Sequence, residues 1–448
     1  MDDTAKIGAD TLDFIHDLRW QDVPEAARYW TKRCVLDLIA VAAAGHGTDL
    51  GRIVRGHAAA QFGAGEAGAR LWFDGRIVSP AGAALANGMT IDAIDAHDGW
   101  RPSKGHAGCG LLPAAMAFAE AEGREDGAEF LTSVALGYEL ACRAGVALHA
   151  SVPDYHTSGA WVAVACAALG ARAMGLDRTR TREAMGIAEY HGPRSQMMRC
   201  IDHPTMVKDG SGWGAMAGVS AAYLARDGFT GAPAITIEAP EVAAYWADLG
   251  RKWLITEQYF KPIPVCRWAQ PAVFAAMTLA ETHGVRGGDI AKVEVEAFHA
   301  AVRLATRHPE TTEQAQYSLP FPLAAGLMLG SVGPETVTGA ALRDPEIASL
   351  SDRVEMRESD AFNAQFPAKR ISAVTLVLKD GRRLVSGPKE APGDPETPLS
   401  EAELDAKYRS YMAARMAPER AERLRAAVLG LEAAGVGALI EMLGAAPD

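Results

Sequence analysis

A chain of 448 residues, 49% of them apolar, can bury a large core and is long enough for two domains. Its net charge of −12 argues against a general nucleic-acid binder, because such a protein needs a basic face to neutralise phosphates. The acidic N-terminus lacks a signal-peptide pattern and no run of 18 apolar residues occurs, so we expect a cytoplasmic protein that crosses no membrane.

The first 270 residues are mainly helical in pattern. The stretch 23–44 has apolar residues at helical spacing, with Pro24 near its start and a glycine after its end. Asp74-Gly75 is a two-residue turn that predicts a hairpin between residues 70–73 and 76–78, and Ser79 should cap the next helix. Further helices are expected near 111–122, 127–148, 158–175, 179–189 and 212–226.

The pattern changes after about residue 285. Residues 292–297 alternate between apolar and polar with period two, as a half-buried strand does. A second strand is expected at 372–378, and Asp380-Gly381 should turn it into a third at 383–385. The other expected features are a helix near 335–342, a stiff linker containing Pro388, Pro392, Pro395 and Pro398, and a capping box of Ser400 with Glu403 that opens a return to helix.

These elements predict a mainly α protein in which a smaller α+β domain interrupts a large all-helical domain. The first part of the helical domain covers residues 1–268, the α+β domain covers 269–397, and the return segment covers 398–448.

Two patterns that could indicate a cofactor or a structural metal lack the necessary context. Residues 63–68 match G-x-G-x-x-G, but a dinucleotide site needs a strand before the motif and a helix after it, and here helical sequence precedes it. The six cysteines form no C-x-x-C pair, which predicts buried thiols with neither disulfides nor a zinc site. No cofactor is therefore expected.

Three acidic residues, Asp92, Asp95 and Asp98, are spaced to share one helical face, with His97 among them. Three carboxylates on one face can hold a divalent cation. They can equally form a solvated helix end, or line a polar site through hydrogen bonds. We favour the polar site and predict no metal, because nothing nearby in the sequence completes a set of oxygen ligands.

Several short segments carry residues that can do chemistry, in the order Ala86-Asn87-Gly88, Asp92 to Asp98, His106, Leu111-Leu112-Pro113, Tyr155 to Gly159, Met206-Val207-Lys208, Phe260 to Trp268 and Tyr317. Their order and spacing resemble those of the MmgE/PrpD family over nearly the whole chain. That family includes 2-methylcitrate dehydratase, cis-aconitate decarboxylase and iminodisuccinate epimerase.

The resemblance implies a homodimer of chains with a helical domain, a smaller lid domain and an active site between them, with no metal and no organic cofactor. The positions that match active-site residues of the decarboxylase branch are Asp95, His106, His156, Lys208, Lys261 and Tyr317. The chain departs from the family pattern at several positions, among them His106-Ala107, where the family has His-Pro, and Lys208 to Ser211, where Lys-x-x-His is common. His97 stands where many relatives carry an acid, Gly99 replaces a hydroxyl residue, and Cys266 replaces a histidine.

The reactions of this family share one physical problem, because negative charge develops next to a carboxylate that is already anionic. Fixed cations in a water-poor cleft stabilise such charge, which is a role suited to Lys208 and Lys261. His106 and His156 can transfer protons near neutral pH, and Asp95 can act as a base or orient one of them.

The remaining candidates contact the substrate. Arg267, with Arg101 and Lys104, is a candidate carboxylate anchor, and Cys266 is assigned to the cavity wall. Tyr317 can donate a hydrogen bond to the substrate. The plainer alternatives are surface charges for the cations, structural hydrogen bonds for the histidines and a core tyrosine.

The sequence therefore favours a lyase acting on a small anionic polycarboxylate, by dehydration or by decarboxylation. An epimerase that uses the same anion-stabilising site is the first alternative. A non-catalytic binding member of the family is an alternative of another class.

Overall fold

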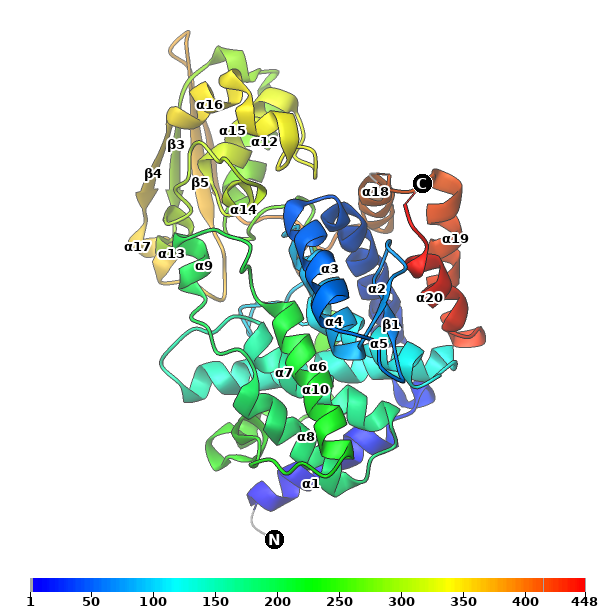
Figure 1. Ribbon diagram of the computed structural model, residues 1–448. Helices are drawn as coiled ribbons and strands as arrows, with labels where there is room; N and C mark the ends of the chain where they lie inside the picture. The colour runs from blue at the N-terminus through cyan, green and yellow to red at the C-terminus, as the bar shows by residue number, and fades with distance from the viewer. Residues whose placement is uncertain (1–2, 414, 448) are drawn as a thin grey trace.

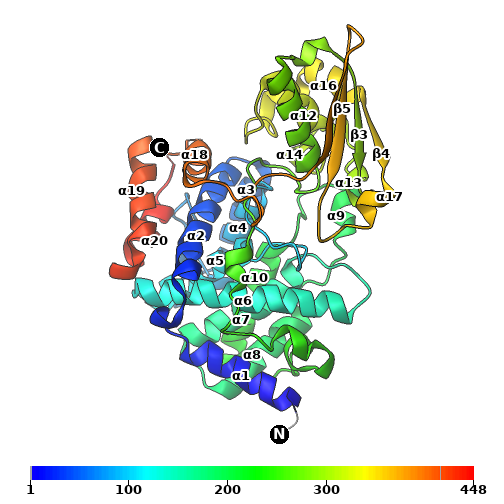
Figure 2. The same ribbon diagram turned by 180° about the vertical axis from the view of Figure 1, so that it is seen from behind.

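The computed structural model describes residues 3–413 and 415–447 as a body of helices joined to a smaller domain built on a sheet (Figures 1 and 2). Both views place the sheet-containing domain at one end of the molecule. The helices of the body before this domain are α1 (Asp3–Asp17), α2 (Glu25–His46), α3 (Asp49–Gln61), α4 (Pro80–Asp92), α5 (Gly108–Ala121), α6 (Gly127–Ser151), α7 (Gly159–Ala173), α8 (Arg178–His191), α9 (Met198–Asp202), α10 (Ser211–Arg226) and α11 (Ile235–Glu238).

Helix α10 packs closely against α4 and α7 because glycines line the contacts. A Cβ atom on Gly88 would lie 2.7 Å from the Cα of Gly212, and one on Gly214 would lie 2.7 Å from the Cα of Gly159. Real Cβ atoms cannot approach so closely, so only glycine allows these backbones to meet. The contacts bring the end of α4 and the beginnings of α7 and α10 to one place in the body.

The smaller domain contains a four-stranded sheet in the order β4-β3-β5-β6. Strand β3 (Ile290–Ala297) runs parallel to β4 (Val354–Glu358) and antiparallel to β5 (Ser372–Leu378), which pairs antiparallel with β6 (Arg383–Lys389). Helix α12 packs on β5 and β6 and against α15. The helices of this domain are α12 (Gln270–His283), α13 (His299–Val302), α14 (Thr312–Gln316), α15 (Pro320–Leu329), α16 (Pro345–Asp352) and α17 (Asp360–Asn363).

After the sheet the chain returns to the helical body, and α18 (Glu401–Met412) and α19 (Pro418–Leu429) pack on α2, while α20 (Gly437–Gly444) packs on α5. Figure 1 shows these C-terminal helices beside the N-terminal ones. The Nζ of Lys407 on α18 lies 2.5 Å from the Oδ1 of Asp37 on α2 and donates to the carbonyl of Ala96 at 2.7 Å. The return segment thus supports the turn that follows α4.

Most predicted elements are confirmed. The structure is mainly α with a smaller α+β region, residues 63–68 form a loop, and all six cysteines are buried free thiols. Ser79 caps α4 by accepting from the N–H of Gly82, and Ser400 forms the expected capping box with Glu403. The proposed limits of the domains, at 268/269 and 397/398, stay a prediction.

Some elements differ from the prediction. The strands β1 (Ala69–Arg70) and β2 (Ile77–Val78) pair as a hairpin, but residues 71–76 form its loop, which is longer than the predicted two-residue turn. Trp72 ends the ladder because its side chain is buried and its N–H donates to the side chain of Asn87.

The other corrections concern the smaller domain. The predicted helix at 335–342 is wrong, because only a 3-10 turn occurs there, at Gly339–Arg343, and the true helix α16 follows it. Strand β4 escaped prediction, since its polar sequence lies at an edge of the sheet and shows no apolar alternation. Pro388, assigned to the linker, lies within the edge strand β6, a position that tolerates a missing N–H donor.

Helix α6 is long and apolar enough to cross a membrane by length and composition, but 89% of its apolar window is buried inside the molecule. Helices α2 and α3 pass the same test only together, and they are bent by 92° at the break between them. Burial of this kind is typical of a core helix in a soluble protein.

We expect Lys407→Met to lower the free energy of unfolding by about 3–5 kcal/mol, because it leaves the Asp37 carboxylate buried without its cation. Urea denaturation measures the loss. Arg409→Ala, on the same helix, removes an exposed ion pair with Glu422 and should leave the urea midpoint unchanged. Equal midpoints for Lys407→Met and the wild type would contradict the supporting role of Lys407.

Candidate active site

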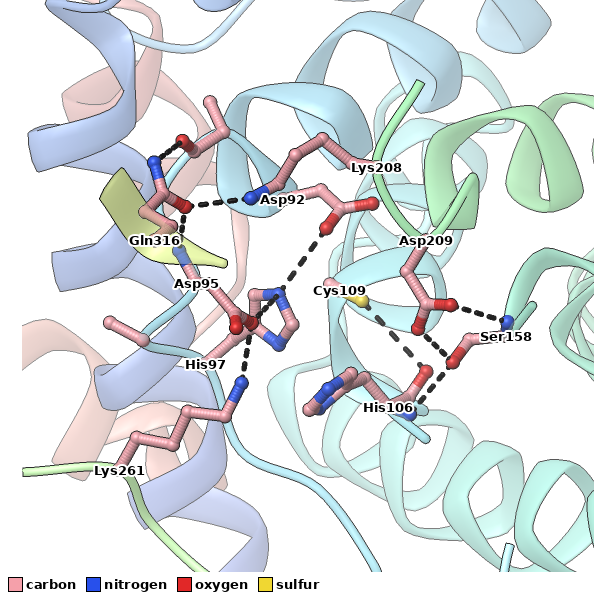
Figure 3. A network of polar contacts seen from close by, with 12 residues as sticks. Asp92, Asp95, His97, His106, Cys109, Ser158, Lys208, Asp209, Lys261 and Gln316 are labelled. Carbon is pink, nitrogen blue, oxygen red and sulfur yellow. Dashed lines mark hydrogen bonds and ion pairs between the residues drawn. The ribbon is translucent and has the colours of Figure 1, made fainter. Parts of the chain in front are cut away.

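The candidate site begins where α4 ends at Asp92 and the chain turns through residues 93–98. The prediction that Asp92, Asp95 and Asp98 share a helical face is wrong, because only Asp92 is helical. All three carboxylates are nevertheless buried, and those of Asp92 and Asp95 belong to one polar network (Figure 3).

A buried ion pair lies at the centre of this network. The Nζ of Lys261 is 2.5 Å from the Oδ1 of Asp95, and both side chains are almost fully buried. Burial raises the pKa of Asp95, but Lys261 and then Lys208 outweigh it and hold that pKa well below its usual range. Asp95 is therefore ionised, and its charge keeps the pKa of Lys261 raised in spite of burial.

A second lysine joins the network through an amide. The Nζ of Lys208 donates to the Oε1 of Gln316 at 2.6 Å, and the same oxygen accepts from the backbone N–H of Asp95 at 2.7 Å. The amide nitrogen of Gln316 donates to the carbonyl of Ala93 at 3.0 Å. Gln316 ends α14 in the smaller domain, so it ties that domain to the turn after α4.

His106 is held as a neutral base. Its Nδ1 lies 2.5 Å from the backbone carbonyl of Asp98, which can only accept, so Nδ1 carries the proton and Nε2 keeps its lone pair. Burial lowers the pKa of His106 well below its ordinary value, and the nearby charges of Lys261 and His97 lower it further. The imidazole is thus available to take a proton at neutral pH.

His97 fills the space between the carboxylates and His106. Its Nε2 is 3.5 Å from Asp92 and 3.8 Å from Asp95, and its ring meets that of His106 edge-on at 4.3 Å between centroids. Figure 3 shows the ring in the middle of the network, between Asp95 and Asp92. Because both histidines are buried together, a positive charge on His97 disfavours protonation of His106.

The start of α10 supplies the opposite wall. Lys208 adopts a left-handed backbone with φ of 49° immediately before Asp209 and Gly210, and this turn directs neighbouring side chains to the site. Asp209 accepts hydrogen bonds from the backbone and hydroxyl of Ser158, whose oxygen in turn accepts from the backbone N–H of His106 at 2.9 Å. Burial, followed by repulsion from Asp92, raises the pKa of Asp209.

A cavity of about 580 Å³ opens beside this wall, and Lys208, Thr157 and Cys200 are among the residues that line it. Tyr317 lies close to Lys208, whose Nζ is 4.6 Å from the centre of the Tyr317 ring. Burial raises the pKa of the Tyr317 hydroxyl well above its ordinary value, so this group stays a hydrogen-bond donor. Cys266 is buried, and its backbone N–H donates to the carbonyl of Gln316 at 2.8 Å.

The structure therefore brings five of the six predicted catalytic residues together around the end of α4. These residues are Asp95, His106, Lys208, Lys261 and Tyr317.

His156 lies in a different electrostatic environment. It is buried next to Thr157, which lines the cavity, and it forms a bridge with Gln196. Burial lowers its pKa, and the charges that act on it most are those of Arg194 and Asp154. Its ring Nδ1 is buried and makes no hydrogen bond to any described residue.

The predicted carboxylate anchors have other partners. Arg267 donates to Asp394 at 2.7 Å and also to Gln270 and to two backbone carbonyls, which favours a structural role. Arg101 pairs with the exposed Glu396. The Nζ of Lys104 lies 4.6 Å from the ring centre of Tyr155.

Sequence reasoning did not single out Gln316, Ser158 or Asp209 for roles in the site. Ser158 lies within the segment Tyr155 to Gly159 and Asp209 directly follows Lys208, and these positions were the available signal. Gln316 precedes Tyr317, but a glutamine among polar residues gives no sign that it will bridge a lysine and a backbone N–H 221 residues away.

Among the described residues, Asp95, His97 and His106 offer ligand atoms within 4.8 Å of one another, which is a spacing that can hold a metal ion. Lys261 competes for this position, because its ammonium already neutralises Asp95 at 2.5 Å. The Nδ1 of His106 also carries a proton that it donates to Asp98. A divalent cation here would be placed against a fixed positive charge.

Family models match most of the chain. The MmgE/PrpD N-terminal domain matches residues 9–247 and the MmgE/PrpD C-terminal domain matches residues 263–433. The chain belongs to the MmgE/PrpD family. The second match extends over α18 and α19, which return to the helical body, and ends before α20.

Curated members of the family include named lyases. Human cis-aconitate decarboxylase is 24% identical over 450 residues, covering 93% of this chain and 90% of that protein. A cis-aconitate decarboxylase-like protein of Aspergillus oryzae is 23% identical, covering 82% of this chain and 83% of that protein. The mitochondrial 2-methylcitrate dehydratase of Yarrowia lipolytica is 26% identical over 244 residues, covering 49% of this chain and 46% of that protein. The MmgE/PrpD protein described here is thus similar to lyases over nearly its whole length.

The lowered pKa of His106 predicts how activity depends on pH. Because its pKa in the folded protein lies below the unfolded value of about 6.5, the neutral form persists as the pH falls through 6.5. We expect kcat/KM to hold its value at pH 6.5 and to decline only at lower pH. A decline centred at or above pH 6.5 would contradict a buried neutral base, and His283→Gln, at the end of α12, should leave the profile unchanged.

The position of Lys261 predicts that no metal is needed. Dialysis against EDTA should leave kcat unchanged, because the ammonium already supplies the positive charge beside Asp95. Activity that EDTA abolishes and a divalent cation restores would overturn this prediction.

Proposed function

We propose that this protein is a cofactor-independent lyase that removes water from a hydroxy-tricarboxylate. The observation that carries the proposal is a neutral imidazole with a free Nε2, at His106, in the same buried cluster as the ammonium groups of Lys208 and Lys261. A base and fixed cations are what proton removal next to a carboxylate requires.

The reaction begins with the transfer of a proton from a carbon next to a carboxylate to the Nε2 of His106. Negative charge moves onto that carboxylate, where the two ammonium groups stabilise it in a buried site. The C–O bond on the neighbouring carbon then breaks, the proton held on the Nε2 of His106 passes to the leaving hydroxyl, which departs as water, and His106 is neutral again. Tyr317, whose hydroxyl stays protonated, can donate a hydrogen bond to the leaving oxygen. The product is an unsaturated polycarboxylate.

Dehydration is favoured over decarboxylation because the first step of dehydration needs a base. Loss of CO2 produces a carbanion without any proton removal, and the site would then need an acid at the position of His106. Because its pKa is lowered, His106 is unprotonated at Nε2 at neutral pH and has no proton there to donate.

Decarboxylation of an unsaturated tricarboxylate is the second candidate, supported by the similarity to cis-aconitate decarboxylases over most of the chain. Epimerisation of a dicarboxylate would use the same proton removal, with a second base returning the proton from the opposite face. A binding protein without activity would make no use of the free Nε2 of His106.

A panel of hydroxy- and unsaturated tricarboxylates incubated with the protein in D2O and followed by NMR separates these functions. The proposal predicts loss of water from a hydroxy-tricarboxylate with no release of CO2. Release of CO2 would establish the decarboxylase instead, and deuterium incorporation without loss of either group would establish an epimerase. A panel unchanged after prolonged incubation would contradict all three enzymes.

Lys208→Ala should lower kcat by about 10²-fold or more, because the site loses a donor that stabilises the developing charge. Steady-state kinetics on the substrate found in the panel measures the effect. Lys252→Ala removes an exposed lysine that pairs with Glu257 and is the matched control, expected to keep full activity. A kcat for Lys208→Ala within twofold of the wild type would remove Lys208 from the mechanism.

A further inference from the structure

Arg370 is a buried cation that pairs with no carboxylate of the described residues 3–413 and 415–447. It lies just before β5 in the smaller domain and is only 4% exposed. Its Nε and Nη1 are buried and make no hydrogen bond to any residue within 3–413 or 415–447. Burying an unsatisfied guanidinium is costly, so its presence calls for a ligand that completes it.

A neighbouring arginine shows what a satisfied guanidinium looks like in the same place. Arg267 and Arg370 both lie 5.2 Å from the centre of the Tyr259 ring. Arg267 donates hydrogen bonds to the Oδ2 of Asp394, at 2.7 Å, and to two backbone carbonyls. Two guanidinium groups thus share one aromatic ring, and the Oδ2 of Asp394 is hydrogen-bonded to Arg267.

Tyr259 connects this pair of arginines to the candidate active site. Its backbone N–H donates to the carbonyl of Gly99 at 2.8 Å, and the N–H of Gly99 donates back at 3.1 Å. A Cβ on Gly99 would lie 2.5 Å from the Tyr259 hydroxyl oxygen and 2.6 Å from the His106 Nδ1. These two atoms therefore lie within about 5 Å of each other, which explains why residue 99 has no side chain.

Other groups of the site respond to the same charge. Arg370 lowers the pKa of Cys266 and of Tyr155, although burial dominates and raises both. The charges of Asp95 and Lys261 also act on the pKa of Cys266. The guanidinium therefore lies near the same buried thiol as the central ion pair. Arg370 comes from the smaller domain, whereas Asp95 and Lys208 come from the helical body.

We propose that Arg370 binds the central carboxylate of the substrate, away from the terminal one that Lys208 and Lys261 stabilise; this rests on the proposed function. The planar guanidinium, with Nε and Nη1 free, is suited to a carboxylate, and the Tyr259 ring supports it. A substrate held by Arg370 and by Lys208 joins the two domains. Arg370 therefore takes the anchoring role that the sequence assigned to Arg267.

The test compares two unreactive ligands that differ by one carboxylate. Tricarballylate has three carboxylates, and glutarate is the same chain without the central one. Isothermal titration of the full-length protein should show tighter binding of tricarballylate. Arg370→Gln should weaken tricarballylate by about 10- to 100-fold and affect glutarate much less, so that the preference is lost.

Two variants separate binding from folding. Arg383→Gln removes an exposed arginine of the same sheet, paired with Glu294, and should bind both ligands as the wild type does. Arg370→Gln should keep or raise Tm, because it removes an uncompensated buried charge. Arg370→Lys, which keeps the charge and loses the planar group, should bind tricarballylate with intermediate affinity.

The proposal is overturned if Arg370→Gln keeps the wild-type preference, if it weakens both ligands equally, or if the wild type shows no preference for tricarballylate. A fall in Tm on Arg370→Gln with unchanged affinities would mark Arg370 as a structural residue. These binding results do not depend on turnover, so they are independent of the D2O panel. If Arg370 binds tricarballylate as expected but the protein dehydrates no substrate, the proposed lyase activity is refuted and the role of Arg370 in binding is not.

Discussion

Close backbone contact between α4, α7 and α10 is the constraint on which the site depends. Gly88 meets Gly212 and Gly159 meets Gly214 at separations that no side chain would permit. This contact places Asp92, Ser158 and Lys208, which are far apart in the sequence, at adjoining ends of three helices. A larger residue at any of these glycines would separate the helices and with them the cations and the base.

The polar network is consistent with a site that must remain charged while buried. Lys261 neutralises Asp95, and Gln316 holds Lys208 near it, so the two cations have defined positions. Burial, with the positive charge of Lys261, keeps His106 neutral. Placing cations beside a base therefore serves two purposes: it stabilises a developing anion and it keeps the base unprotonated. Lys407 supports the turn that carries Asp95 by donating a hydrogen bond to the carbonyl of Ala96.

Much of this arrangement could be predicted from the sequence, where local patterns and family resemblance apply. Helical spacing and caps predicted most helices, and the motif order identified Asp95, Lys208 and Lys261. The acidic triplet was misread because periodicity cannot show that α4 ends at Asp92. Arg370 follows a lysine and precedes a strand, which in sequence indicates a surface charge, and only tertiary packing buries it.

The state of His106 is the central claim, and nitrogen-15 NMR of histidine-labelled protein tests it most directly, with His106→Asn assigning the signals. The account predicts that at pH 7 the His106 ring is neutral, with a proton on Nδ1 and a bare Nε2. Spectra that show a protonated imidazolium, or a neutral ring with the proton on Nε2, would contradict it, because neither form can take a proton from the substrate through Nε2.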